Sequence, residues 1–104
     1  MMFDVRFLPN PHFIPELKPL TGQDASVAAF LCEQREVVET IERFCNLLDF
    51  LMPRYRREGR SYLTIGVGCT GGKHRSVYIA DTLSEYLGQQ GYSARANHRD
   101  IAKL

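Results

Sequence analysis

Residues 69–76, Cys-Thr-Gly-Gly-Lys-His-Arg-Ser, gather the side chains of this chain that are best suited to chemistry. An apolar run at 62–67 precedes them and an amphipathic run follows, so the pattern predicts a strand, a glycine-rich loop and a helix. Such a turn aims several main-chain N–H groups and the positive end of a helix at one point. The sequence therefore predicts an anion site of the phosphate type. The cationic side chains of Lys73, His74 and Arg75 at the helix start fit a site that holds an anion.

Three phosphate-site templates can be compared with this loop. The nucleoside triphosphate template G-x-x-x-x-G-K-[ST] fails, because Val67 stands six positions before Lys73 and His74 replaces the hydroxyl residue. The dinucleotide template G-x-G-x-x-G fits residues 66–71, but no acidic residue closes the next strand to hold a ribose. The cysteine phosphatase template C-x-x-G-x-x-R-[ST] is satisfied in full by Cys69, Gly72, Arg75 and Ser76.

A cysteine-dependent phosphatase is therefore an alternative, with Cys69 and Arg75 as its catalytic residues. A helix N-terminus would favour the thiolate that attacks phosphorus, and a guanidinium would hold the phosphate oxygens through two hydrogen bonds. The reaction also needs an acid for the leaving oxygen. The candidates are Asp4, Asp24 and Asp100, and the sequence places none of them over the loop.

Length and composition describe one ordinary globular domain, residues 1–104, with 44% apolar and 24% charged residues. The net charge of +1 gives no overall field for nucleic acid or membrane, so such a partner requires a local basic patch. The N-terminus does not resemble a signal peptide, and three cysteines without a short pairing pattern predict a reducing, cytoplasmic location. No metal-type Cys/His spacing is present, and no cofactor is expected.

The order of elements follows from periodicity. Residues 3–8 alternate as a strand that turns Phe3, Val5 and Phe7 to one face, and a proline-rich loop follows. Residues 27–52 read as one amphipathic helix, with an N-cap at Asp24 or Ser26 and an end or kink at Pro53.

Residues 62–67 predict a central strand, the run after the loop predicts a helix that ends at Gly91, and residues 93–99 alternate as a last strand. Strand, helix, strand, helix, strand predicts an α/β fold with a small parallel or mostly parallel sheet. Ligands collect at the carboxyl ends of such strands, where His12, His74 and His98 are expected.

Four segments carry a resemblance to a known family: residues 4–11, 20–24, 65–77 and 97–100. They are similar to the C-terminal domain of the RapZ (YvcJ) RNase adapter proteins, and the run Gly-Cys-Thr-Gly-Gly-Lys-His-Arg-Ser-Val is the most specific part. The resemblance covers essentially the whole chain. It implies an α/β domain like a subdomain of phosphofructokinase. Full-length relatives add an N-terminal nucleotide-binding domain, so this chain looks like a stand-alone or excised C-terminal half.

The resemblance also implies a non-catalytic function. Such a domain binds an amino-sugar phosphate, glucosamine-6-phosphate, and a small regulatory RNA, which it presents to an endoribonuclease as part of a homo-oligomer. In such relatives the binding of the sugar phosphate opposes the binding of RNA, which implies that the domain is a metabolite sensor. Carried over by position, phosphate contacts would come from Thr70, Gly71 and Arg75, and sugar contacts from Asp4 and His12. The complete implied ligand set is Asp4, His12, Thr70, Gly71, Gly72, Lys73, His74 and Arg75.

The chain departs from the family pattern at its C-terminus. RNA-binding relatives finish in a cluster of lysines and arginines, whereas residues 100–104 read Asp-Ile-Ala-Lys-Leu. Phosphate contacts dominate RNA affinity, which leaves weaker candidates: Arg54, Arg57, Arg95, Arg99 and Lys103. A solvated basic turn is the other interpretation of the arginines near Pro53. A plain RNA-binding or oligomerisation module with a structural anion is a third reading of the domain.

Overall fold

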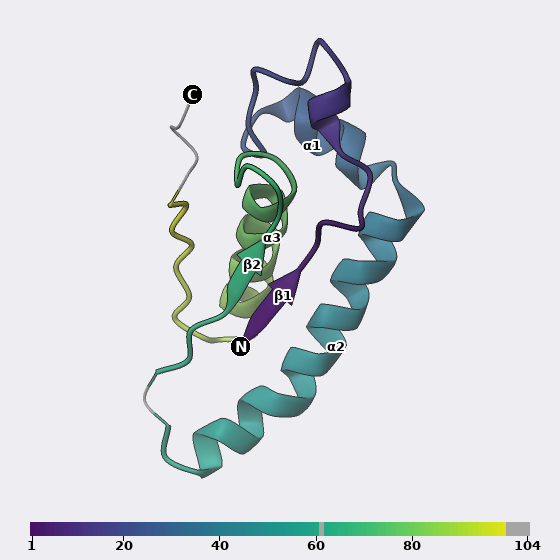
Figure 1. Ribbon diagram of the computed structural model, residues 1–104. Helices are drawn as coiled ribbons and strands as arrows, with labels where there is room; N and C mark the ends of the chain where they lie inside the picture. The colour runs from purple at the N-terminus through teal and green to yellow at the C-terminus, as the bar shows by residue number, and fades with distance from the viewer. Residues whose placement is uncertain (61, 100–104) are drawn as a thin grey trace.

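The computed structural model describes residues 1–60 and 62–99 and confirms the α/β class. Two short parallel strands lie at the centre, with α2 running along one side and α3 behind β2 (Figure 1). The element order is β1 (Met2–Asp4), the 3-10 helix η1 (Pro11–Phe13), α1 (Ala25–Cys32), α2 (Arg35–Arg57), β2 (Gly66–Gly68) and α3 (Arg75–Gln89).

The parallel pairing of the first two strands is confirmed. Phe3 lies opposite Val67, and the ladder continues beyond β1 through a 2.8 Å hydrogen bond from the Val5 N–H to the Gly68 carbonyl. Parallel neighbours need a long connection between them, and η1, α1 and α2 supply it here. Both strands therefore end at the same edge of the sheet, and the glycine-rich loop leaves from that edge.

The first strand is shorter than the alternation predicts. After Val5 the chain turns, and the Leu8 N–H donates to the Val5 carbonyl at 3.2 Å. Because of this turn, Leu8 is buried while Phe7 is 64% exposed. The predicted shared face of Phe3, Val5 and Phe7 is therefore wrong at Phe7.

The single predicted helix over 27–52 is divided into α1 and α2. Gln34 has an extended backbone, with ψ of 117°, and its side-chain amide donates to the Phe30 carbonyl at 3.2 Å. The Gln34 side chain thus gives a free carbonyl in the last turn of α1 a hydrogen-bond donor, while its backbone is the N-cap of α2. Of the two alternatives predicted at Pro53, an end or a kink, the end is wrong, because α2 continues to Arg57. The Arg54 guanidinium donates to the Phe50 carbonyl at 2.7 Å and supports the backbone beside the proline.

The later predictions are met in part. Gly91, with φ of 90°, closes α3, because the Tyr92 N–H donates to the Leu87 carbonyl and the Gly91 N–H to the Gly88 carbonyl. Asp24 is the N-cap residue of α1, although its carboxylate accepts from Thr21 and not from the helix. The strand predicted at 62–67 is confined to Gly66–Gly68. The strand predicted over 93–99 is not confirmed: residues 93–98 have no regular secondary structure, Arg99 lies in a turn, and none of them belongs to the sheet.

The core lies between the strands and the three α-helices. Phe3 stacks on Phe44 of α2 with ring centroids 4.0 Å apart. The other buried apolar side chains come from every layer: Val5, Leu8, Leu17, Val27, Leu31, Val37, Leu48, Val77, Ile79, Leu83 and Leu87. Within the described ranges, no helix combines the length and the apolar character that a bilayer crossing demands.

Gly22 fixes how closely the N-terminal segment approaches the start of α3. Its N–H donates to the Lys73 carbonyl at 2.8 Å, and a Cβ atom at this position would meet the His74 carbonyl and lie 2.6 Å from the Tyr78 nitrogen. Both obstacles are backbone atoms, so neither can rotate away.

We therefore expect Gly22→Ala to lower the free energy of unfolding by about 1–3 kcal/mol, the usual cost of overpacking. The matched control is Gly88→Ala, because Gly88 lies within α3 and its added Cβ meets nothing within 4 Å. That variant should be neutral or stabilising by up to about 1 kcal/mol. Urea unfolding followed by circular dichroism measures both, and equal stabilities would contradict the close approach.

Candidate functional site

The glycine-rich loop joins the end of β2 to the start of α3. Gly71 and Gly72 are both in the left-handed region, with φ of 82° and 66°, a conformation that other residues rarely adopt. Within residues 1–60 and 62–99, the main-chain N–H groups of residues 70–75 donate to no protein acceptor. The loop therefore presents a run of unpaired donors at the positive end of a 15-residue helix.

Cys69 stands at the beginning of this loop. Its Sγ accepts a hydrogen bond from the Ser76 N–H at 3.3 Å, so the sulfur satisfies one of the donors in the first turn of α3. The side chain is half-buried and packs against the core. A donor aimed at the cysteine sulfur is also a feature of a cysteine phosphatase loop.

The Arg75 guanidinium is 98% buried and ties α3 to the segment after β1. Its Nη1 donates to the carbonyls of Arg6 at 2.7 Å and Leu8 at 3.0 Å. Nε is buried without a partner, and Nη2 also donates to nothing in the described part of the chain. One side of the fork therefore holds main chain, while the Nε and Nη2 side retains the donors that bind an oxyanion through two hydrogen bonds.

His74 forms a second tie to the N-terminal segment. Its Nε2 lies 3.1 Å from the Leu17 carbonyl and the ring is buried. Because a carbonyl can only accept, Nε2 carries the hydrogen in this arrangement. Lys73 lies half-buried between Gly72 and His74, and its carbonyl takes the Gly22 N–H.

Asp4 lies near this clamp and His12 lies on η1. The Arg6 guanidinium holds the Asp4 carboxylate with N–O distances of 2.7 to 3.0 Å, and these hydrogen bonds, with a smaller contribution from the charge of Arg75, lower the pKa of Asp4. His12 is exposed, and its ring meets Phe13 edge-on with centroids 5.7 Å apart.

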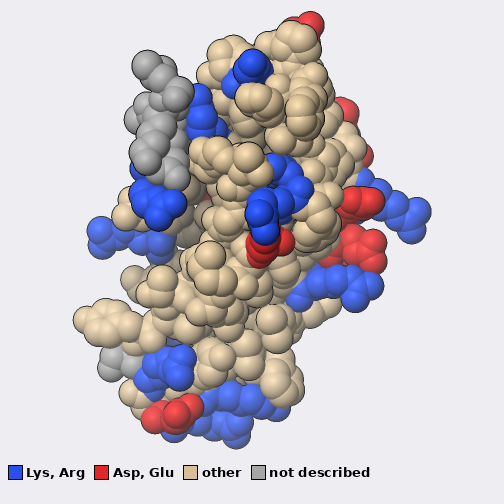
Figure 2. Space-filling model, in the orientation of Figure 1, with Lys and Arg blue, Asp and Glu red and all other residues tan. Residues whose placement is uncertain are grey.

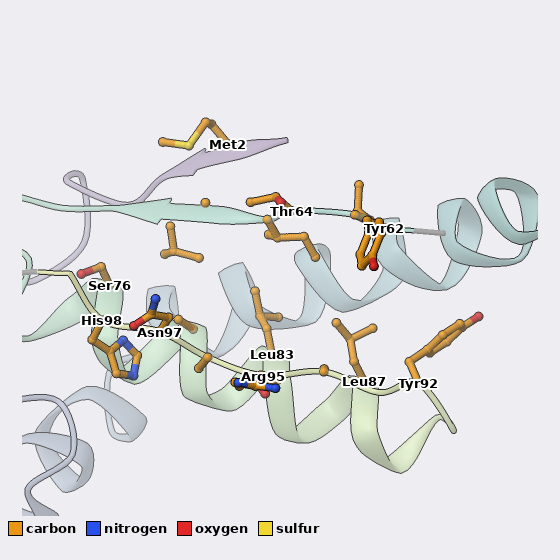
Figure 3. Close-up of a pocket in the computed structure, with 18 of the residues that line it drawn as sticks. Met2, Tyr62, Thr64, Ser76, Leu83, Leu87, Tyr92, Arg95, Asn97 and His98 are labelled. Carbon is orange, nitrogen blue, oxygen red and sulfur yellow. The ribbon is translucent and has the colours of Figure 1, made fainter. Parts of the chain in front are cut away.

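A groove of about 930 Å³ reaches the loop from the other side (Figure 3). Cys69, Gly72 and Ser76 line its loop end, β2 and the residues before it form one wall, and residues 92–99 form the opposite wall. On that wall, His98 Nε2 pairs with Asp81 of α3 at 2.7 Å. Sequence reasoning missed Asp81, because the only signal was one acidic residue within an amphipathic helix, 17 positions before its partner.

The acids proposed for phosphatase chemistry are not assembled over Cys69. Asp4 pairs with Arg6, and Asp24 accepts from the N–H of Thr21 at 2.7 Å. Asp100 lies outside the described residues. Groups of three or more His, Cys, Asp and Glu side chains suited to a metal ion are absent from the parts of the chain described.

The predicted RNA-binding arginines fall into two places. Arg54 and Arg57 lie at the C-terminal end of α2, where Arg54 stacks 3.7 Å from the centroid of Phe50. Figure 2 shows basic side chains gathered at this lower end of the molecule. Arg95 and Arg99 line the groove. The fifth candidate, Lys103, lies outside the described residues.

Fold and site together define a small α/β type of domain, in which a glycine-rich loop leaves the carboxyl edge of a parallel sheet and leads into a helix. The chain belongs to the RapZ C-terminal domain family, whose model matches residues 1–102.

Curated relatives support this assignment. A protein of Solibacter usitatus (strain Ellin6076) is 54% identical over 103 residues, which cover 99% of this chain and 32% of the relative. Relatives from Geobacter metallireducens, 50% identical, and Anaeromyxobacter sp. (strain K), 55% identical, match 99% of this chain and 36% and 35% of their own lengths. All three are named nucleotide-binding proteins. The chain thus spans about a third of the length of these relatives.

The Arg75 clamp makes a prediction for stability. Arg75→Lys and Arg75→Ala should each lower the free energy of unfolding, by about 1–3 kcal/mol for every buried carbonyl left without a donor. Arg75→Lys should cost less, because its ammonium can still reach one carbonyl.

The control is Arg43→Ala, which removes an exposed 3.0 Å pair with Glu39 worth less than about 1 kcal/mol. Urea unfolding of the wild type, Arg75→Lys, Arg75→Ala and Arg43→Ala measures the four free energies of unfolding. If Arg75→Ala were as stable as Arg43→Ala, the clamp would not hold the fold together.

Proposed function

We propose that this domain is a non-catalytic cytoplasmic sensor of phosphorylated amino sugars, of the glucosamine-6-phosphate type, that also contacts RNA as part of an RNase adapter protein. The observation that carries the proposal is the run of unpaired main-chain donors around Gly71 and Gly72 at the start of α3. A phosphate monoester supplies the charge and the several acceptor oxygens that such a loop can use.

Three groups would hold the phosphate. The N–H groups of Thr70, Gly71 and Gly72 would donate from the loop, and the Lys73 ammonium would add charge. The free side of the Arg75 guanidinium supports the same assignment, because Nε is buried and lacks an acceptor. A phosphate oxygen would supply this acceptor, while Nη1 keeps its two carbonyls. The Arg75 guanidinium would then stabilise the fold through Nη1 and bind the ligand through Nε.

The amino sugar would be recognised by Asp4 and His12, with His74 between the loop and the N-terminal segment. The Asp4 carboxylate is exposed and already holds a cation, the Arg6 guanidinium, at 2.7 Å, so a sugar ammonium could take the place of that guanidinium. His12 is exposed on η1 and is open to a sugar hydroxyl. This assignment requires no covalent step.

A phosphatase is the alternative, and the contact from the Ser76 N–H to Cys69 Sγ favours it. An N–H donor stabilises a thiolate at a helix N-terminus. Against it, the two described candidates for the acid, Asp4 and Asp24, are engaged with Arg6 and Thr21, and a reaction without an acid for the leaving oxygen is slow. The binding experiment below therefore includes a measurement of phosphate release.

The proposed site makes a prediction for ligand binding. Glucosamine-6-phosphate should bind with a Kd in the micromolar range, on the order of −8 kcal/mol, while glucosamine should not bind detectably. Gly71→Ala should weaken binding at least about tenfold, since a Cβ strains the left-handed backbone that aims the donors. Arg75→Ala should abolish binding. Isothermal titration calorimetry measures these affinities.

The matched control is Gly59→Ala. Gly59 also has a positive φ, 87°, and open space around its Cβ position, but it lies at the end of α2. It should bind the sugar phosphate as the wild type does. Wild-type affinity in Gly71→Ala would contradict the proposed loop site. Release of phosphate by the wild type, lost in Cys69→Ser, would establish the phosphatase instead.

The RNA contact has its own prediction. A double variant, Arg54→Ala with Arg57→Ala, should weaken binding of a hairpin RNA and lower the slope of log affinity against log salt by about 1–2. Addition of glucosamine-6-phosphate should oppose RNA binding. Fluorescence anisotropy at several salt concentrations measures both effects, with Arg43→Ala, about three helical turns before Arg54 on α2, as the control.

An unchanged slope in the double variant would exclude the end of α2 from the RNA surface. A steep slope that does not respond to the sugar phosphate would favour a plain RNA-binding module. In the larger adapter protein we expect such domains to act as homo-oligomers that offer the RNA to an endoribonuclease.

A further inference from the structure

The groove beside β2 is lined by charge of one sign. Its cationic lining residues are Arg56, Arg60, Arg95 and Arg99. Within residues 1–60 and 62–99 no Asp or Glu side chain lines it, although the chain has 12 acidic residues. Since the net charge of the whole chain is only +1, this separation makes the groove a local basic surface that attracts a polyanion.

Aromatic side chains lie at one end of the groove. Figure 3 shows Tyr62 and Tyr92 on opposite walls of that end, while Ser76 and His98 lie at the other end. Tyr62 is 90% exposed, so its ring is open to a stacking partner. Stacking on an aromatic ring is a common way to hold the unpaired bases of a nucleic acid, and it tolerates any base sequence.

Two of the arginines are stacked on tyrosine rings within the groove lining. The Arg56 guanidinium lies 4.5 Å from the ring centroid of Tyr92. The Arg60 guanidinium lies 4.5 Å from that of Tyr55. A guanidinium that stacks through its face presents its N–H groups at its edge, and this edge binds phosphate oxygens. The groove thus combines surfaces for flat rings with donors for phosphate.

We propose that this groove binds a single-stranded segment of RNA, with Tyr62 as a stacking platform and Arg95 as a phosphate contact. The inference rests on the RNA contact of the proposed function, and it adds where the strand lies and that its bases are unpaired. The volume of about 930 Å³ is near the upper end of ordinary ligand sites, about 300–1,000 Å³, which leaves room for a ligand larger than a monosaccharide phosphate.

The chemistry of the lining favours a single strand over other polyanions. In an RNA duplex the bases are paired and stacked on one another, so their faces are closed to Tyr62. An acidic peptide would satisfy the arginines, but its carboxylates offer no flat ring to the tyrosines. Only an unpaired strand supplies both phosphates and open base faces.

Fluorescence anisotropy of the chain with a short labelled oligouridine tests the proposal, and a blunt RNA duplex of equal length is the comparison. Oligouridine should bind at least about fivefold more tightly than the duplex. Tyr62→Ala should weaken oligouridine binding at least about fivefold, the effect of one lost stacking contact, whereas Tyr62→Phe keeps the ring and should bind as the wild type does. The matched control is Phe7→Ala, because Phe7 is 64% exposed but does not line this groove.

The salt dependence of the same binding tests the phosphate contact. Arg95→Ala should lower the slope of log affinity against log salt by about 0.7, the loss of one phosphate contact to a single strand. Arg35→Ala is the control, because Arg35 is exposed at the start of α2 and does not line the groove. Its slope should equal that of the wild type.

Equal affinity of Tyr62→Ala and the wild type for oligouridine, or tighter binding of the duplex, would overturn the proposal. A remaining effect of the double variant at Arg54 and Arg57 would then leave the RNA contact on α2 without the groove. Displacement of oligouridine by a polyglutamate peptide, with no effect of Tyr62→Ala, would assign the groove to an acidic protein segment. Calorimetry with glucosamine-6-phosphate reads the sugar site separately, and Tyr62→Ala should bind this sugar phosphate as the wild type does.

Discussion

The fold and the candidate site both depend on one clamp between the segment after β1 and the first turn of α3. Arg75 holds the carbonyls of Arg6 and Leu8, His74 holds that of Leu17, and the Lys73 carbonyl receives the Gly22 N–H. The irregular N-terminal segment has few internal partners for its carbonyls, and buried carbonyls are costly when unsatisfied. Side chains from the loop and helix start meet that need.

The same clamp keeps the loop in shape. A set of N–H donors binds an anion well only when the donors already point at one place, because ordering them at the moment of binding costs affinity. On the C-terminal side of Gly71 and Gly72, residues 73–75 are bonded to the N-terminal segment of the chain. On the N-terminal side, the Cys69 sulfur accepts a hydrogen bond from the Ser76 N–H and so fixes the start of the loop to α3. The main-chain N–H groups of the loop are thus held in place by contacts on both sides, and none of these N–H groups is used in those contacts.

Local patterns were enough to predict the turn chemistry. Glycines at 71, 72 and 91 occupy left-handed positions, and the parallel pair of strands follows from two apolar runs separated by helical sequence. Periodicity alone could not reveal the break at Gln34, because the break depends on a side chain that caps the preceding helix. The sequence could not predict the exposure of Phe7 either. The alternation of apolar and polar residues continues past Val5 in the sequence, but the backbone turns there.

Long-range partners could not be predicted at all. Arg75 was expected to face a ligand, and nothing in its own neighbourhood indicates that carbonyls 67 and 69 positions away take two of its donors. A guanidinium has five N–H groups, so both roles are possible, and only the geometry shows how they are divided. The contact between His98 and Asp81 could not be predicted for the same reason, because in the sequence each residue looks like an ordinary surface polar group.

Tyr92 gives the C-terminal part of the chain a fixed starting point. Its N–H closes the last turn of α3, and its ring lies under the Arg56 guanidinium at 4.5 Å, so the ends of α2 and α3 are joined through one side chain. The backbone beyond Tyr92 therefore starts from a point that both helices hold. A substitution that removed this ring would loosen the join between the two helix ends and, with it, the place where residues 92–99 begin to line the groove.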